Sequence, residues 1–218
     1  MKYKLVVFDL DGTLIDNIES AWKTLHEFFE IDQHPKRLEI RKKFFSGEIT
    51  YHEWGSRDLE LLSEHGANRE KIMKAFKKAK VMEGAMETIK FLKGKGYKTA
   101  IISGSMNILL EKLIPDYKEI FDHVFINNIF FDEKGEIKDF ELTSFEQVNK
   151  KTGLLKICEL EGIQPKECVF VGDHYNDIDI AEAAGFSIAF NSKSEDLNKV
   201  SDVVIKKKDL REVLKYLN

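Results

Sequence analysis

The chain opens with a short apolar run that ends in acidic residues. Residues 4–10 read KLVVFDL, a length and composition typical of a buried parallel strand with a polar carboxyl end. Further strands are expected where similar runs recur, at 97–103, 121–126, 168–172, 186–190 and 202–205. Helices are expected from apolar residues at helical spacing, at 85–95, 108–114, 145–161, 177–184 and 210–217. Strands that alternate with helices predict an α/β fold with a parallel sheet covered on both faces.

Two stretches depart from this alternation. Residues 130–142 hold the sequence DEKGE between two apolar segments, which predicts a hairpin. Residues 16–80 show no strand pattern and instead carry four apolar stripes at helical spacing, at 18–29, 38–45, 51–62 and 72–79. We therefore expect a core made of residues 1–15 and 81–218, with residues 16–80 inserted as a helical cap.

Composition narrows the class of protein. Hydrophobic residues make up 43% of the 218 residues, which excludes a disordered or low-complexity chain. The 34 basic and 38 acidic residues nearly balance, so no nucleic-acid partner is expected. Two cysteines are too few for a disulfide framework. The first residues fit neither a signal peptide nor a membrane span, so we expect a cytoplasmic protein without a membrane partner.

Acidic residues follow two of the expected strands. Asp9 and Asp11 come after the first strand, and Asp173 and Asp177 come after 168–172. The carboxyl ends of parallel strands meet at one edge of a sheet, where ligands bind. An Asp-Gly pair alone can mark a turn, but four clustered carboxylates need a counter-charge. Oxygen ligands without His or Cys favour a hard cation, here Mg²⁺.

Four ordered motifs identify the chain as similar to a known family. They are FDLDGTL at 8–14, IISGS at 101–105, Lys150 before a helix, and VGDHYND at 171–177. Together they resemble the haloacid dehalogenase-like hydrolase superfamily, in its phosphoserine phosphatase-like branch, over essentially the whole chain. The resemblance implies a Rossmann-like core with a mobile helical cap inserted just after the first strand.

The resemblance also implies catalytic roles. Asp9 would be the nucleophile that forms an aspartyl-phosphate, and Asp11 would protonate the leaving alcohol and then activate water. Lys150 would neutralise charge on the nucleophile and the phosphoryl group. Lys151 is its neighbour, and the spacing to the following helix fits the family better through Lys150.

Binding roles follow from the same resemblance. Ser103 and the backbone N–H of Gly104, expected at a helix N-terminus, would hold a phosphoryl oxygen, together with Asn176. Ser105 would face the phosphate or cap the helix, and His174 would lie in a partly exposed loop near the substrate. The residues expected around Mg²⁺ are Asp9, Asp11 through its carbonyl, Asp173 and Asp177.

The cap departs from the phosphoserine phosphatase pattern. That branch carries a Glu nine residues after the nucleophile, where this chain has Ile18 with Glu19 beside it. It also carries an Arg on the third cap helix, where this chain has Asp58 with Arg57 beside it. We therefore expect a Mg²⁺-dependent phosphatase for a small phosphomonoester other than phosphoserine. The alternatives are a phosphoserine phosphatase, a mutase-type phosphotransferase and a non-catalytic binding module.

Asp58 has two interpretations. It lies on the apolar stripe of its expected helix, so it is either a structural ion pair with a Lys or Arg of the cap or a ligand group in the cleft. In the second case the pocket would disfavour a free carboxylate, with Trp22 and Trp54 as its walls.

Overall fold

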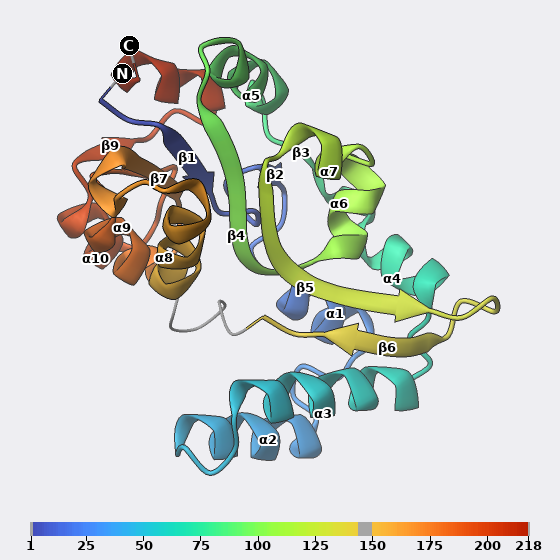
Figure 1. Ribbon diagram of the computed structural model, residues 1–218. Helices are drawn as coiled ribbons and strands as arrows, with labels where there is room; N and C mark the ends of the chain where they lie inside the picture. Colours follow the sequence, from blue (N-terminus) through green and yellow to red (C-terminus); the bar gives the residue numbers. More distant parts are fainter. Residues whose placement is uncertain (1, 144–149, 218) are drawn as a thin grey trace.

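A computed structural model describes residues 2–143 and 150–217. Its centre is a seven-stranded sheet in the order β6-β5-β4-β1-β7-β8-β9 (Figure 1). The strands are β1 (Leu5–Phe8), β4 (Lys98–Met106), β5 (His123–Phe131), β6 (Ile137–Glu141), β7 (Cys168–Gly172), β8 (Phe186–Phe190) and β9 (Val203–Ile205). All neighbouring pairs are parallel except β5–β6. The predicted α/β class is therefore confirmed.

Helices cover both faces of the sheet. One layer holds α5 (Ala85–Gly94), α6 (Asn107–Leu113) and α7 (Tyr117–Ile120), and the other holds α8 (Lys150–Glu161), α9 (Ile178–Ala183) and α10 (Glu195–Val200) (Figure 1). Alternate residues of β1 serve the two layers, as the pleat of a strand requires. Val6 and Phe8 belong to one apolar cluster with Ile89 of α5, and Leu5 and Val7 to another with α8 and α9.

Four helices stand between residues 16 and 80 of the chain, as the apolar stripes predict. They are α1 (Ala21–Phe28), α2 (Pro35–Phe45), α3 (Tyr51–Glu64) and α4 (Arg69–Ala75), followed by the 3-10 turn η1 (Phe76–Lys78). Local capping explains where they begin: the side chains of Ser20, Thr50 and Asn68 each accept a hydrogen bond from a backbone N–H of the first turn. We call residues 17–79 the helical insertion; its helices α2 and α3 lie at the end of the molecule opposite the two termini (Figure 1).

A two-stranded ribbon that the sequence pattern did not predict joins the two ends of the helical insertion. In it, β2 (Ile15–Asp16) pairs antiparallel with β3 (Lys80–Val81). Asp16 is buried and forms ion pairs with Lys80, at 3.5 Å, and with Lys208. Burial alone would raise the pKa of Asp16, but the bonds that its carboxylate accepts from Lys208 and the Asn17 backbone, with the charges of Lys208 and Lys80, together lower the pKa. The chain therefore enters and leaves the helical insertion at paired residues, beside the ion pairs of Asp16.

Other elements agree with the pattern to differing degrees. The hairpin expected at 130–142 is confirmed as β5–β6, with Ile129 opposite Phe140. The last helix is a 3-10 helix, η4 (Leu210–Tyr216), and short 3-10 turns η2 (Pro165–Glu167) and η3 (Tyr175–Asp177) flank β7. The helix expected from 145 is described from Lys150, and 145–149 lie outside the described residues. Among the described helices, none has the length and apolar character needed to cross a membrane.

Candidate active site

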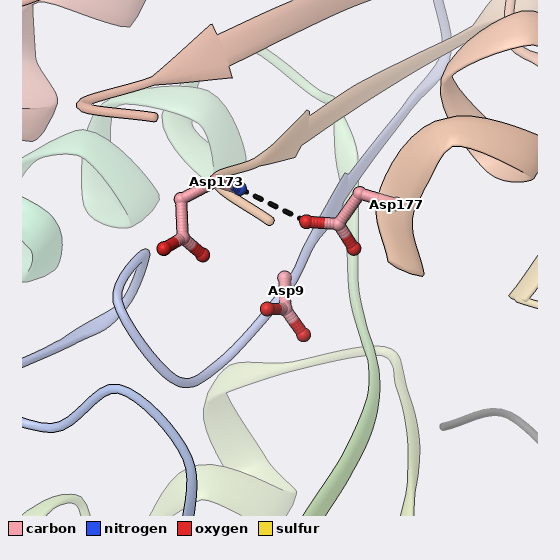
Figure 2. Close-up of side chains that lie close together, drawn as sticks. All are labelled: Asp9, Asp173 and Asp177. Atoms are coloured by element: carbon pink, nitrogen blue, oxygen red, sulfur yellow. Dashed lines mark hydrogen bonds between the residues drawn. The ribbon is translucent and has the colours of Figure 1, made fainter. Parts of the chain in front are cut away.

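Three acids meet at the carboxyl edge of the sheet. Asp9 follows β1, Asp173 follows β7, and Asp177 ends η3. Because Phe8 is paired with Val171 in neighbouring parallel strands, both strands deliver their following residues to the same edge. One carboxylate oxygen from each acid lies within 4.8 Å of the others, and Figure 2 shows the three side chains around one point.

Lys150, the first residue of α8 in the described chain, lies between two of these acids. Its Nζ atom is 2.7 Å from Asp9 Oδ1 and 2.6 Å from Asp177 Oδ1. Only 1% of Lys150 is exposed. Burial alone would lower the pKa of Lys150, but the charges of Asp177 and Asp9 outweigh it and raise the pKa. Lys150 is therefore a buried cation beside Asp9, whereas the neighbouring Lys151 is exposed.

Asp177 positions the loop after β7 as well as Lys150. Its Oδ2 atom accepts a hydrogen bond from the backbone N–H of Asp173 at 2.9 Å (Figure 2). The same atom accepts one from the backbone N–H of His174 at 3.0 Å. Gly172 permits this approach, since a Cβ atom there would lie 2.3 Å from Asp177 Oδ2. Burial raises the pKa of Asp177 to about 6 despite the nearby charge of Lys150.

The acidic cluster is suited to a metal ion. Burial, together with the charges of Asp9 and Asp177, raises the pKa of Asp173 well above its usual range, because three acids share a single buried cation. Thr13 stabilises Asp173 by donating a hydrogen bond from Oγ1 to Oδ1 at 3.2 Å. A divalent cation would supply the missing counter-charge, and an oxygen-only ligand set fits a hard cation. Asp9 and Asp173 are the acids best placed to hold it, because both oxygens of Asp177 accept hydrogen bonds.

Asp11 is linked to both the sheet and the helical insertion. Its Oδ1 atom accepts a hydrogen bond from Ser105 Oγ at 2.8 Å, and its Oδ2 atom accepts one from the backbone N–H of Ala21 at 2.7 Å. Burial of the carboxyl group, with the charge of Asp9 adding to it, raises the pKa of Asp11 to about 6. This carboxyl group is therefore able to carry a proton close to neutral pH.

The segment 103–105 differs from the expectation. Ser103, Gly104 and Ser105 belong to β4, and α6 begins only at Asn107. The expected helix N-terminus at Gly104 and the helix-cap interpretation of Ser105 are therefore wrong. The chain extends β4 past an irregularity between Ile102 and Met106 instead of turning into the helix. Ser103 and Gly104 still line the same cavity as Asp9 and Asp11.

Sequence reasoning missed Asn127 of β5. Its Nδ2 atom donates to the carbonyl oxygen of Gly104 at 2.7 Å and lies 3.3 Å from Tyr51 Oη of the helical insertion. Its Oδ1 atom accepts from the backbone N–H of Thr143 at 2.7 Å. Asn127 is fully buried, and two adjacent asparagines inside the apolar run FINNIFF were the available signal.

A cavity of about 360 Å³ lies between the sheet edge and the helical insertion. From the sheet side it is lined by Asp9, Asp11, Ser103, Gly104, Ser105, His174, Tyr175 and Asn176. From the insertion it is lined by Glu19, Ser20, Trp22, Lys23, His26, Asp32, Arg37, Arg41, Phe45, Tyr51, Trp54, Gly55 and Asp58. The cavity therefore reaches from the acidic cluster to a chamber with aromatic walls and both signs of charge.

The insertion residues singled out from the sequence fall in different places. Ile18 packs against the apolar core, whereas Glu19 is exposed and pairs with Lys23 at 2.9 Å. Asp58 is buried, and the side chain beside its Oδ2 atom is that of His26, with Nε2 at 3.2 Å, instead of the Lys or Arg expected. The expectation of a pocket hostile to carboxylates did not include Arg37 and Arg41 of α2, which line the cavity. Arg41 lies on the apolar stripe of residues 38–45, but that stripe alone did not predict that the Arg41 side chain faces the cavity.

Comparisons with known proteins agree with this geometry. The sequence profile of the haloacid dehalogenase-like hydrolases matches residues 3–185. The phosphoserine phosphatase of Methanocaldococcus jannaschii is 34% identical over 219 residues, which cover 99% of this chain and 98% of that protein. The phosphoserine phosphatase of Archaeoglobus fulgidus is 32% identical over 95% of this chain, which spans only 58% of that protein. A solved structure described as a phospho-aspartyl intermediate analogue of phosphoserine phosphatase has a TM-score of 0.75 at 34% identity and covers 99% of both chains.

Proposed function

The chain belongs to the haloacid dehalogenase-like hydrolases and is a phosphatase, and from this premise we propose that it hydrolyses O-phosphoserine with the help of Mg²⁺. The substrate proposal replaces the expectation of a different phosphomonoester. That expectation was based on the residues at positions 18 and 58. A curated relative and a solved structure that each match 99% of the chain at 34% identity are described as phosphoserine phosphatases, which favours the alternative.

One observation in the structure supports this substrate more than any other. The leaving group of phosphoserine carries an ammonium and a carboxylate, so its pocket must offer both signs of charge. The helical insertion places Arg37 and Arg41 on the same cavity as Asp58. An acid for the ammonium and an arginine for the carboxylate are thus both present, although at other positions than the resemblance implies.

The proposed reaction has two steps. The Asp9 carboxylate attacks phosphorus and the bond between phosphorus and the serine oxygen breaks, while Asp11 gives its proton to that oxygen. Asp11 then accepts a proton from water, which attacks the aspartyl-phosphate and releases inorganic phosphate. Lys150, 2.7 Å from Asp9, reduces the repulsion between the nucleophile and the phosphoryl group.

Further groups hold the phosphoryl group and the proposed metal. Ser103 and Gly104 would bind a phosphoryl oxygen, and Asn176 lines the same cavity. Mg²⁺ held by Asp9, Asp173 and the carbonyl of Asp11, with Asp177 behind them, would neutralise charge on the phosphoryl oxygens.

We also propose that residues 16–80 act as a cap on a core of residues 1–15 and 81–218. A cap explains how water is excluded during the first step and admitted for the second. The ribbon of β2 and β3, where Ile15 pairs with Val81, is the place for its hinge. A disulfide engineered to lock the cap closed should stop turnover, and undiminished turnover would overturn this proposal.

The test of function is phosphate release from purified protein with a panel of phosphomonoesters, in Mg²⁺, in Ca²⁺ and after chelation. We expect O-phosphoserine to have the highest kcat/KM, Mg²⁺ to be required, and Ca²⁺ to inhibit because it prefers more oxygen ligands in a looser geometry. Another best substrate would overturn the phosphoserine proposal. Full activity after chelation would overturn the metal proposal, and phosphoryl transfer to a sugar faster than to water would favour the mutase alternative.

A further inference from the structure

The cavity holds several buried polar atoms that the protein itself does not satisfy. Among the described residues these include Nδ1 of His26, Oδ1 of Asp58 and Nε1 of Trp54, and each of these three residues lines the cavity. Buried polar groups in proteins are nearly always hydrogen-bonded, and a buried one without a partner costs free energy. Three such atoms around one cavity indicate a site whose partners come from a ligand.

The contact between His26 and Asp58 is incomplete as a structural ion pair. Both residues are only 2% exposed, and His26 Nε2 lies 3.2 Å from Asp58 Oδ2. This contact is not a hydrogen bond, since His26 Nε2 has no hydrogen-bond partner. A pair retained for stability alone would satisfy both oxygens and both ring nitrogens. Here one ring lies against Oδ2, and Oδ1 of Asp58 is buried without a hydrogen-bond donor.

Trp54 and Arg37 each provide a hydrogen-bond donor in the cavity that Asp58 also lines. Trp54 stands one turn before Asp58 on α3, so both side chains share a face of that helix. The Trp54 ring is held by stacking on Phe44, with centroids 4.4 Å apart, while its Nε1–H remains without an acceptor. Arg37 of α2 also lines the cavity, and its Nε atom is buried without a partner.

On the basis of the proposed function, we propose that Asp58 binds the ammonium group of the substrate's serine part and that Trp54 binds its carboxylate. Asp58 offers an acceptor with negative charge, and Trp54 offers a neutral donor supported by the charge of Arg37. His26 Nε2 lies 3.2 Å from the other oxygen of Asp58. Substrate recognition is therefore carried by a buried acid on α3, at a position where the resemblance implies an arginine.

The experiment measures kcat/KM for three substrates that differ in one group each. O-phosphoserine has the ammonium and the carboxylate, O-phosphoethanolamine has only the ammonium, and ethylene glycol monophosphate has a hydroxyl in place of the ammonium. Asp58→Asn keeps the size of the side chain and removes its charge. Glu19→Gln is the matched control, because Glu19 lines the same cavity but is exposed and paired with Lys23.

In wild type we expect O-phosphoethanolamine to be favoured over ethylene glycol monophosphate. Asp58→Asn should reduce that preference by about 30-fold or more, as expected when one partner of a buried charge pair is removed. Its kcat/KM for ethylene glycol monophosphate should stay within about threefold of wild type. Trp54→Phe should lower the preference for O-phosphoserine over O-phosphoethanolamine, and Glu19→Gln should leave both ratios unchanged.

The outcomes separate this inference from the proposed function. If Asp58→Asn lowers kcat/KM equally for all three substrates, or leaves the ammonium preference intact, Asp58 is a structural residue and the inference fails while a phosphoserine preference stands. If wild type prefers O-phosphoethanolamine to O-phosphoserine and Asp58→Asn removes the ammonium preference, the phosphoserine proposal fails and the role of Asp58 stands. If Trp54→Phe folds and keeps the wild-type preference for O-phosphoserine over O-phosphoethanolamine, only the role of Trp54 is overturned.

Discussion

Trp22 donates a hydrogen bond from Nε1 to the carbonyl oxygen of Gly104, 3.1 Å away. The two residues come from α1 of the helical insertion and from the segment of β4 that lines the active-site cavity. The same oxygen accepts a second bond from Asn127 Nδ2 at 2.7 Å. The helical insertion is therefore fastened directly to the backbone proposed to hold the phosphoryl group.

This arrangement predicts unequal effects for its two donors. Trp22→Phe removes one bond but leaves Gly104 with Asn127, so the free energy of unfolding should fall by only about 1 kcal/mol. Asn127→Ala leaves Gly104 with Trp22 but also removes the acceptor for Thr143, and should cost about 2–4 kcal/mol. Urea unfolding of both variants checks the order, and equal losses would contradict it.

The two adjacent lysines provide a matched pair for catalysis. Lys150→Met should abolish phosphate release, because it removes the buried cation beside Asp9 and leaves the acids uncompensated. Lys151→Met should keep activity within about threefold of wild type, because that side chain is exposed. Steady-state phosphate release measures both, with circular dichroism to verify folding. An inactive but folded Lys151→Met beside an active Lys150→Met would reverse the assignment.

Asp9→Asn is expected to eliminate turnover while the protein stays folded. The substitution keeps the size of the side chain, and Lys150 retains its 2.6 Å contact with Asp177. What is lost is the proposed nucleophile and one acid of the cluster. Turnover near the wild-type rate in the purified, folded variant would exclude a covalent intermediate on Asp9.

Gly172→Ala should damage the active site through a single methyl group. The added Cβ would lie 2.3 Å from Asp177 Oδ2, so Asp177 must move and lose its bonds to the backbone of Asp173 and His174. We expect activity to fall at least tenfold and stability to fall by about 1–3 kcal/mol. The control is Gly94→Ala at the end of α5, where the added Cβ meets nothing within 4 Å and stability should be unchanged or higher by up to about 1 kcal/mol.

Asp209 should contribute to stability in a defined range of pH. Its bonds with the Arg211 side chain lower the pKa of Asp209 to about 2, from the ordinary value of 3.8. A carboxyl group with a lowered pKa stabilises the fold above its unfolded pKa and loses that contribution as the pH falls through its folded pKa. The difference in unfolding free energy between wild type and Asp209→Asn should therefore be constant above about pH 5 and shrink between pH 4 and 2. Denaturant unfolding over that range measures it, and a difference that grows toward pH 2 would contradict the assignment.

The sequence predicted best those elements whose burial shows in a local pattern. The strands at 168–172 and 186–190 have the predicted bounds, because each is a short apolar run buried on both faces. The ribbon of β2 and β3 escaped notice because two residues per strand are too few for a periodic pattern. The end of β4 was misjudged because IISGS resembles a strand followed by a helix cap, while the strand continues to Met106.

The residues of the site were likewise predictable only where their placement follows from a local pattern. Asp9, Asp173 and Asp177 could be placed together because parallel neighbours deliver their ends to one edge. The sequence could not identify His26 as the neighbour of Asp58. That contact depends on how α1 packs beside α3, and no local spacing relates the two residues. Arg37 and Arg41 were missed for a similar reason, because the direction in which α2 faces is set by its packing on α3.

The position of β1 has a consequence for how the protein is made. β1 is the first strand of the chain, yet it lies between β4 and β7 in the finished sheet, and Leu5 pairs with Cys168. During synthesis the first strand emerges long before β7 exists, and it remains without its second neighbour until about three quarters of the chain has been made. A nascent chain or a fragment that stops before residue 168 carries Asp9 and Asp11 but lacks Asp173 and Asp177. Such incomplete chains expose an unpaired apolar strand edge, which makes them candidates for chaperone binding, and they lack two acids of the cluster until residue 177 has been made.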